Sequence, residues 1–324
     1  MPETFTSFMA RALHDPQRGY YARKVQTIGA KGDFSTSATL SPLLGQAIAH
    51  WLTEESEAMP EVRHIIEVGA GNGQLMQTIR QSLGWWKRRC FHWHIVDTSE
   101  GLRDQQKQRL GKRVTWHTDL SSALTTVGGK AFIYHNELLD AFPVILIQWQ
   151  DNQWQEVHVD LNGNSAQEIL QDHSLTDSEL ADFSVFQQVP RFKDQRVELH
   201  LSVRDWLKSW APAWTHGSML TVDYGDLFPA LYHRRPHGTL RAYLLHQRLD
   251  GLALYQNIGR QDITADINFT DYRKWTQALG WEEITFQDQA SFIKARTKSP
   301  SNQFMDPDGA GGAFKVLTHR KLFK

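Results

Sequence analysis

The sequence predicts an α/β fold built on a mostly parallel sheet, with helices connecting its strands. Short apolar runs at 65–68, 92–96, 114–117 and 131–135 alternate with segments of helical periodicity. A glycine-rich turn follows the first run, and polar residues follow the others. Because parallel strands of open α/β folds bring their carboxyl ends to one edge of the sheet, we expect a ligand site at that edge.

The glycine-rich turn indicates which ligand the site binds. It consists of Gly69, Ala70, Gly71, Asn72 and Gly73. The third glycine comes two residues after the second, whereas the dinucleotide fingerprint has a spacing of three and binds a pyrophosphate. Glu67, just before the turn, would repel a phosphate but can hold an ammonium group or a hydroxyl. This pattern favours S-adenosylmethionine, although glycine turns also close ordinary strand-to-helix connections.

Polar residues after the next strands complete the expected cofactor site. Asp97 can accept hydrogen bonds from both ribose hydroxyls, and Asp119 is placed to meet the adenine amino group. A simpler interpretation is that Asp97, Thr98 or Ser99 begins the following helix and that Asp119 caps the next turn. Asn136, after the fourth strand, can bond the amino acid end of the cofactor through its carbonyl.

The composition excludes several classes of partner. The 35 Lys and Arg residues nearly balance the 36 Asp and Glu residues, so we expect no nucleic acid partner. No apolar segment approaches the roughly 20 residues needed to span a bilayer, so we expect no membrane insertion. The single Cys90 excludes an internal disulfide, fits a reducing compartment and leaves no cysteine cluster for a metal, so we expect none. The first residues show no signal or transit pattern, and we expect a cytoplasmic location. The 12 tryptophans fit either the core or an interface, such as that of a homodimer.

The remaining segments are assigned in chain order. We expect a helix from Thr6 or Ser7 to Leu13, a helix with Ser41 at its N-cap, a hairpin of 144–149 and 154–159, a helix at 202–210, a strand at 218–223, a helix at 270–279, and strands at 281–286 and 314–319. Residues 160–196 lose clear periodicity and are expected as an insertion, as are 226–268. We therefore assign 57–160, 197–225 and 269–324 to a cofactor-binding core, and 1–56, 161–196 and 226–268 to a substrate-facing cap.

Motifs along almost the whole chain resemble the MidA-like family, also called the DUF185 family, which includes a mitochondrial methyltransferase that assists assembly of respiratory complex I. The matching segments are Asp15-Pro16 with Gly19-Tyr20-Tyr21, Gly32-Asp33-Phe34 with Thr36, Ser41 with Gly45, Glu67-Val68-Gly69 with Gly71 and Gly73-Gln74-Leu75-Met76, Asn136-Glu137, Asp140-Ala141 and Pro143, Trp154 with Glu156, Asp223-Tyr224-Gly225, Gly238 to Tyr243 with His246, Asp262-Ile263-Thr264 with Phe269, and Phe314 to Leu317. The most specific are the Asn-Glu-x-x-Asp-Ala-x-Pro run and the Asp-Ile-Thr segment. The departures are Gln46, Ala70, Asn72, Ile258 and Ala310.

The resemblance implies a class I S-adenosylmethionine-dependent methyltransferase. Its fold is Rossmann-like, with a mostly parallel seven-stranded sheet, an antiparallel last strand and a smaller cap formed by the N-terminus and insertions. The cofactor is S-adenosylmethionine, the product is S-adenosylhomocysteine, and the substrate is, by analogy, an arginine on a complex I subunit. From its own composition, the polar loop that contains Gly32, Asp33 and Thr36 is either an ordinary connector or a lid, and we expect a lid, with Gly32 and Thr36 among the cofactor-binding residues.

Arginine methylation requires carboxylates near the transferred methyl group. The guanidinium is protonated and its lone pairs are delocalised, so carboxylates that grip two nitrogens can concentrate electron density on the third. Glu137 is the first candidate, with Asp140 and Asp33 behind it, although Asp140 can equally cap a helix start. The expected substrate-binding residues are Tyr224, His246 and Arg241.

Three other functions remain open from the sequence. A methyltransferase acting on a small molecule predicts a closed, largely apolar pocket. A non-catalytic assembly factor would bind S-adenosylmethionine only to hold a shape. An NAD-dependent dehydrogenase is disfavoured by the glycine spacing and by Glu67.

Overall fold

The computed structural model describes residues 2–23, 41–162, 165–187, 192–244, 247–298, 306 and 309–322. The chain forms two compact units. Unit 1 comprises residues 1–26, 139–206 and 225–275, and unit 2 comprises residues 27–138, 207–224 and 276–324. Residues 139–160, which the sequence patterns place with the core, thus belong to unit 1.

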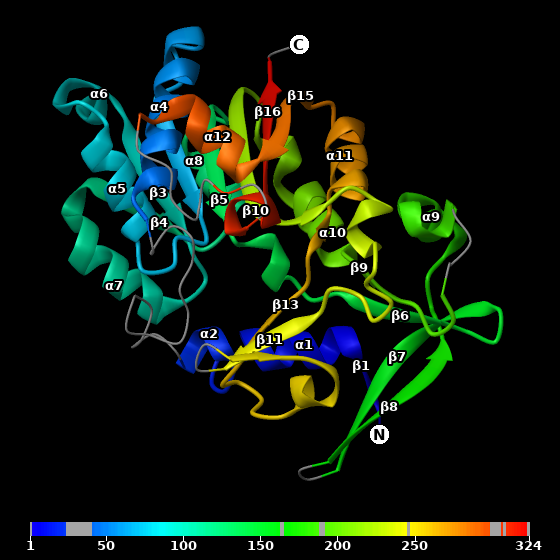
Figure 1. Cartoon of the computed structure of the whole chain (residues 1–324). Helices are drawn as coiled ribbons and strands as arrows, with labels where there is room; N and C mark the ends of the chain where they lie inside the picture. Colours follow the sequence, from blue (N-terminus) through cyan, green and yellow to red (C-terminus); the bar gives the residue numbers. More distant parts are fainter. Residues whose placement is uncertain are drawn as a thin grey trace. The chain divides into compact units, whose positions relative to one another are not determined.

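A mostly parallel sheet forms the centre of unit 2. Within the described residues seven of its eight strands run in the order β15 (Glu282–Asp288), β16 (Phe314–Lys321), β10 (Gly217–Asp226), β5 (Ala131–Asn136), β2 (His64–Val68), β3 (His92–Val96) and β4 (Val114–His117). Strands β10, β5, β2, β3 and β4 are parallel neighbours, whereas β16 is antiparallel to both β10 and β15. The predicted mostly parallel sheet with an antiparallel last strand is therefore confirmed (Figure 1).

Helices connect and cover these strands. They are α4 (Leu43–Ala58), α5 (Gln74–Ser82), α6 (Trp85–Cys90), α7 (Glu100–Leu110), α8 (Leu120–Thr126), α12 (Gln289–Arg296) and α13 (Ala310–Ala313), with the 3-10 turns η2 (Gly111–Arg113) and η5 (Ala211–Ala213). One face of the sheet contributes alternate residues such as Ile65, Trp93 and Phe132 to the core. Ile48 of α4 and Ile79 of α5 belong to the same buried cluster, so these helices bury their apolar stripes on that face.

Unit 1 holds two antiparallel sheets in its described residues. The larger has the order β1 (Glu3–Thr4), β7 (Gln153–Asn162), β6 (Ile145–Gln150) and β9 (Arg196–Leu199), with β8 (Ser165–Asp172) also paired to β7. The smaller has the order β12 (Gln247–Leu249), β11 (Arg241–Leu244) and β13 (Asp262–Thr264). A core that includes Phe8, Val157 and Ile263 joins the sheets to helix α1 (Phe5–His14).

Shorter elements complete unit 1. They are α2 (Tyr20–Arg23), η3 (Leu139–Ala141), α9 (Asp177–Asp182), η4 (Ser184–Gln187), the start of α10 (Leu201–Trp210), η6 (Ala230–Tyr232), η7 (Gly251–Tyr255), β14 (Ile267–Asn268) and most of α11 (Phe269–Ala278). Strand β14 is parallel to the last two residues of β10, Gly225 and Asp226. A Cβ on Gly225 would lie 2.1 Å from the Ile267 carbonyl oxygen, so only glycine permits this approach.

Three local predictions need correction. Helix α1 begins at Phe5, because Thr4 is its N-cap and accepts the N–H of Ser7 at 3.1 Å. The N-cap of α4 is Pro42 instead of Ser41, whose hydroxyl accepts the Leu43 N–H at 3.3 Å. The insertion at 160–196 contains β8 and α9, which the loss of periodicity did not predict.

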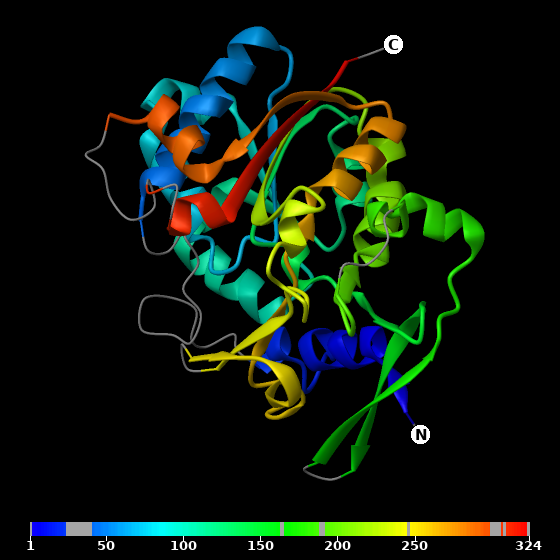
Figure 2. The ribbon, with the colours of Figure 1, turned by 45° about the vertical axis from the view of Figure 1, so that its right-hand side comes forward.

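The physical reason for the missed strand is its exposure. Strand β8 carries no fully buried residue and pairs with β7 along its whole length (Figure 1 and Figure 2). Ala166 and Leu170 pack against the core only in part, and Glu168 lies between them, so the strand lacks the alternating apolar pattern by which strands are recognised. Among the described residues, no helix is both long and apolar enough to cross a membrane.

Candidate functional site

The carboxyl ends of three parallel strands bring the predicted site residues of unit 2 to one edge. Val68 at the end of β2 is in register with Val96 of β3, and Glu67 is in register with Tyr134 of β5. The glycine-rich turn and Asp97 therefore follow neighbouring strand ends, and Asn136 is the last residue of β5. This arrangement is the one expected from the order of strands and polar residues in the sequence.

The glycine-rich turn adopts a backbone that other residues would strain. Gly69, Gly71 and Gly73 have φ values of 69°, 51° and 80°, in the left-handed region that favours glycine. A Cβ on Gly69 would lie 2.7 Å from Leu138 Cδ1, whereas one on Gly71 would meet no described atom within 4 Å. The turn thus leaves open space at Gly71. Asn72 closes the turn, because its side-chain oxygen accepts the Gln74 N–H at 3.1 Å at the start of α5.

Glu67 is a buried carboxyl group beside the turn. Its side chain is only 2% exposed, and the Tyr134 hydroxyl donates a hydrogen bond to Oε2 at 3.1 Å. Burial raises the pKa of Glu67 to about 8, and the negative charge of Asp97 adds to the increase. A positively charged group beside it would favour the ionised form. This site therefore suits an ammonium ligand better than an anion.

Asp97 is held in place by a residue that the sequence patterns do not single out. Gln106 Nε2 of α7 donates to Asp97 Oδ2 at 2.7 Å and to the Gly71 carbonyl at 2.8 Å. Trp116 Nε1 donates to Gln106 Oε1 at 3.0 Å, so both the nitrogen and the oxygen of the Gln106 amide are hydrogen-bonded. Gln106 lies four residues after Leu102, on the buried face of α7. A polar residue in an apolar helical stripe is the signal that could have identified it.

The residues after β5 form a tightly held turn. Glu137 has a φ of 51°, and its N–H donates to the Val222 carbonyl at 2.9 Å. Asp223 Oδ2 at the end of β10 accepts the next N–H, that of Leu138, at 3.1 Å. A non-glycine residue in this conformation is strained, and such strain concentrates at functional sites. The turn places the Glu137 carboxylate at the same sheet edge as Glu67.

Asn136 offers an acceptor to a ligand. Its Nδ2 donates to Glu137 Oε1 at 2.9 Å, while its Oδ1 is buried and has no hydrogen-bond partner within the described part of the chain. A buried acceptor without a partner is costly unless a ligand or water supplies a donor. Together with Glu67, this atom fits the ammonium group of an amino acid moiety, and the Asp97 carboxylate fits a pair of ribose hydroxyls.

Other predicted residues of unit 2 have structural contacts. Asp119 is exposed and caps α8, since its Oδ1 accepts the Ser122 N–H at 2.7 Å. Ser99, not Asp97 or Thr98, is the N-cap of α7. Thr98 is exposed. Tyr224 is half-buried, and its ring lies 3.9 Å from that of Phe314 between centroids. A direct contact of Asp119 with adenine stays a prediction.

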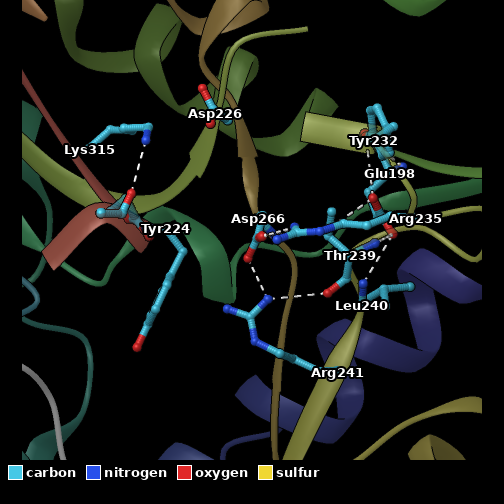
Figure 3. Close-up of polar contacts among 12 residues, drawn as sticks. Glu198, Tyr224, Asp226, Tyr232, Arg235, Thr239, Leu240, Arg241, Asp266 and Lys315 are labelled. Atoms are coloured by element: carbon cyan, nitrogen blue, oxygen red, sulfur yellow. Dashed lines mark hydrogen bonds and ion pairs between the residues drawn. The ribbon is translucent and has the colours of Figure 1, made fainter. Parts of the chain in front are cut away.

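Two predicted residues belong to unit 1. Asp140 is buried in η3, and its backbone carbonyl accepts the Ala265 N–H at 3.0 Å. Arg241 is buried too, and its guanidinium donates to the Asp266 carboxylate and to the Thr239 carbonyl at 3.2 Å (Figure 3). These contacts give Arg241 a structural role within unit 1. Its role in substrate binding stays a prediction.

The same scaffold contains a second buried acid. Glu198 Oε1 accepts the backbone N–H groups of Thr239 at 2.7 Å and Leu240 at 3.1 Å (Figure 3). Arg235 Nη1 lies 2.6 Å from Asp266 Oδ2. The Gly-Thr-Leu-Arg segment is therefore fixed by two carboxylates, which gives this motif a structural role.

Four predicted residues, Gly32, Asp33, Thr36 and His246, lie outside the described residues. Within the described ranges, no group of three or more His, Cys, Asp or Glu side chains could hold a metal ion.

A mostly parallel sheet with an antiparallel last strand, a GxGxG turn and acidic residues at the ends of β2 and β3 define a class I S-adenosylmethionine-dependent methyltransferase. The chain belongs to the family described as "Putative S-adenosyl-L-methionine-dependent methyltransferase", whose sequence model matches residues 47–287. S-adenosylmethionine is thus the cofactor, and the predicted enzyme class is confirmed.

Relatives and solved structures agree with this assignment. The protein arginine methyltransferase NDUFAF7 homolog, mitochondrial, of Drosophila melanogaster is 27% identical over 308 residues, which cover 86% of this chain and 68% of that protein. The corresponding Xenopus laevis protein is 25% identical over 99% of this chain and 82% of its own length. A COG1565 superfamily member from Burkholderia thailandensis, solved bound to S-adenosyl-homocysteine, has a TM-score of 0.85 at 23% identity and covers 99% of this chain and 88% of its own. The resemblance to the MidA-like family is confirmed.

The expected cytoplasmic location is wrong. The curated relatives from Drosophila, Xenopus and human are named as mitochondrial proteins, which points away from the cytoplasm. The expectation depended on the absence of a leader pattern, and such an absence does not identify a compartment.

Proposed function

We propose that this enzyme methylates an arginine side chain of a protein, and that its target is a subunit of respiratory complex I. The observation that carries the proposal is the similarity to relatives named protein arginine methyltransferases, which extends over 83% or more of the chain. The resemblance to the MidA-like family supports a target in complex I. A carboxylate at the cofactor edge supports arginine as the acceptor.

We assign cofactor binding to the sheet edge of unit 2. Glu67 and Asn136 Oδ1 bind the ammonium group of S-adenosylmethionine, and Asp97 binds its ribose hydroxyls. The glycine-rich turn leaves room for the main-chain atoms of its amino acid moiety. Gln106 is a positioning residue, because it fixes Asp97 and the Gly71 carbonyl together. When bound, S-adenosylmethionine supplies an activated methyl group on a positively charged sulfur.

Glu137 is the proposed catalytic carboxylate. Its backbone is fixed by β10, and its Oε1 accepts a hydrogen bond from Asn136 at 2.9 Å. A carboxylate held in this way can accept two guanidinium N–H groups and leave the third nitrogen free to be methylated. Fixed geometry contributes most of the rate effect when the methyl donor is already activated.

The test is transfer of labelled methyl groups from S-adenosylmethionine to purified complex I subunits. We expect label in one protein band, on arginine after acid hydrolysis, and loss of that label with Glu137→Gln. Methylation of small molecules from a protein-free extract with no labelled band would overturn the proposal. Cofactor binding without any transfer would identify a non-catalytic assembly factor.

A further inference from the structure

A positively charged pocket lies away from the cofactor edge of unit 2. It has a volume of about 470 Å³, and its lining includes His92 and Val114 together with the cations Arg80, Arg88, Arg89, Lys112 and Arg113. His92 and Val114 are the first residues of the parallel strands β3 and β4. The pocket is therefore at the amino end of these strands, opposite the edge that carries the glycine-rich turn.

The lining has five cationic side chains and no carboxylate among the described residues that form it. The whole chain is almost neutral, so this is a local concentration of positive charge. Burial lowers the pKa of Arg80, and the nearby charges of Arg88 and Arg113 lower it further. Like charges that crowd together without a counterion favour an anionic ligand.

One buried nitrogen of Arg80 also lacks a hydrogen-bond partner. Its Nη1 donates to the Leu110 carbonyl at 3.2 Å, whereas its Nε is buried with no hydrogen-bond partner in the described chain. The guanidinium lies 5.7 Å from the centre of the Trp93 ring. An anion that enters the pocket can accept a hydrogen bond from this guanidinium and neutralise its neighbours.

Two exposed tryptophans lie beside Arg89, one of the residues that line the pocket. Trp85 and Trp86 of α6 are 51% and 77% exposed, and their rings lie 4.7 Å apart. Arg89, which lines the pocket, lies 4.7 Å above the Trp85 ring. Helix α6 can be followed beside α5 in Figure 1. The surface thus combines a cationic pocket with large apolar rings, and we call it the α6 patch.

We propose that the α6 patch binds the phosphate headgroup of an anionic phospholipid, with Trp85 and Trp86 in the interfacial layer of the membrane. Clustered Lys and Arg residues bind anionic lipid surfaces, and tryptophan prefers the headgroup region. A single-stranded nucleic acid would need cations that follow successive phosphates and aromatic rings between them. Here the cations converge on one pocket and the exposed rings lie outside it, which favours a headgroup.

The test uses the full chain and two kinds of vesicle, phosphatidylcholine alone and phosphatidylcholine mixed with phosphatidylglycerol. We expect co-sedimentation only with the anionic vesicles, a blue shift of tryptophan fluorescence, and weaker binding at higher salt. The double variant R88Q/R89Q removes two cations and should weaken binding about tenfold, because each cation near the surface contributes several-fold. The double variant W85A/W86A should abolish the blue shift.

The matched control is K294Q/K298Q, which removes two exposed cations on and after α12, outside the pocket. It should leave vesicle binding unchanged. All variants should bind S-adenosylhomocysteine like the wild type, which shows that they fold. Equal binding to neutral vesicles, or no effect of R88Q/R89Q, would overturn the proposal. Displacement by glycerol 3-phosphate without any role of the tryptophans would indicate a soluble phosphate ligand, and binding to an oligonucleotide instead of vesicles would indicate a nucleic acid.

Discussion

Gln106 Nε2 lies 2.7 Å from Asp97 Oδ2, so the carboxylate after β3 is held by an amide from the following helix. The same nitrogen lies 2.8 Å from the Gly71 carbonyl oxygen. One buried side chain therefore ties the glycine-rich turn to the acidic residue beside it.

Replacement of Gln106 by methionine tests this tie. The variant keeps the volume of the side chain but leaves Asp97 Oδ2 and the Gly71 carbonyl without their donor. We expect a loss of roughly 1–3 kcal/mol of unfolding free energy, since buried polar groups lose a partner. The affinity for S-adenosylhomocysteine, measured by calorimetry, should fall about tenfold. The control Trp116→Phe removes only the donor to Gln106 Oε1 and should have a smaller effect on affinity.

Glu67→Gln tests the buried carboxyl. The folded pKa of Glu67 is about 8, above its usual value of 4.5, so its contribution to stability is present at low pH and is lost as pH rises through 8. The amide variant has no charge to bury. As pH rises from 5 to 8, the unfolding free energy of Glu67→Gln should therefore increase by about 3 kcal/mol relative to that of wild type.

The same variant should bind the cofactor poorly. A charge-assisted hydrogen bond to the ammonium group is lost, so we expect the affinity for S-adenosylhomocysteine to fall about 10- to 100-fold. The matched variant is Tyr134→Phe, which keeps the Glu67 carboxyl and removes only the hydroxyl that donates to it. Undiminished affinity in Glu67→Gln would show that this carboxyl does not contact the ligand.

Glu137→Gln separates binding from catalysis. The amide keeps the shape and the contact with Asn136 but cannot hold a guanidinium as an anion. We expect the dissociation constant of S-adenosylhomocysteine to stay the same and kcat to fall on the order of a hundredfold. Asp140→Asn in unit 1 is the comparison. If turnover is unchanged in Glu137→Gln and falls in Asp140→Asn, the catalytic carboxylate has been assigned to the wrong residue.

The sequence predicted the sheet and the position of the site because both depend on local patterns. Buried strands such as β5 begin with a continuous apolar run, and the glycine-rich turn has a spacing that few other turns share. The role of Gln106 was not predictable in this way, since it depends on atoms 35 residues away at Gly71. The sequence left open whether Asp97 caps the following helix or binds the ligand. In the structure Ser99 is the N-cap of that helix, which leaves Asp97 beside its neighbours at the sheet edge.

The pairing of Arg241 with Asp266 shows a second limit. A basic residue in a polar insertion is usually solvated, yet tertiary structure buries this one on an acidic partner 25 residues later in the chain. No local pattern distinguishes the two cases. Strand β8 escaped prediction for another reason, because none of its residues is fully buried and Glu168 lies between Ala166 and Leu170 in the strand.

A row of histidines across the sheet predicts a pH dependence of stability. His94 Nε2 lies 3.0 Å from His64 Nδ1, and His94 Nδ1 lies 3.1 Å from His117 Nε2. Burial lowers the pKa of His94 to about 4, and the charges of the neighbouring histidines, His92 included, lower it further. Asp119 acts in the opposite direction on His117.

Because the folded pKa of His94 lies below the unfolded value of about 6.5, its contribution to stability is present above pH 6.5 and is lost as pH falls toward 4. Between pH 8 and pH 5 we expect His94 to contribute a loss of about 2 kcal/mol, measured by urea denaturation as the difference between wild type and His94→Gln. Residue 94 of His94→Gln cannot titrate, so this variant should lack that loss. His50→Gln, which replaces a histidine with a 53% exposed side chain, should keep it. If the unfolding free energy changed equally with pH in wild type and in His94→Gln, protonation of the row of histidines would not destabilise the fold. Any acid sensitivity would then arise from other groups.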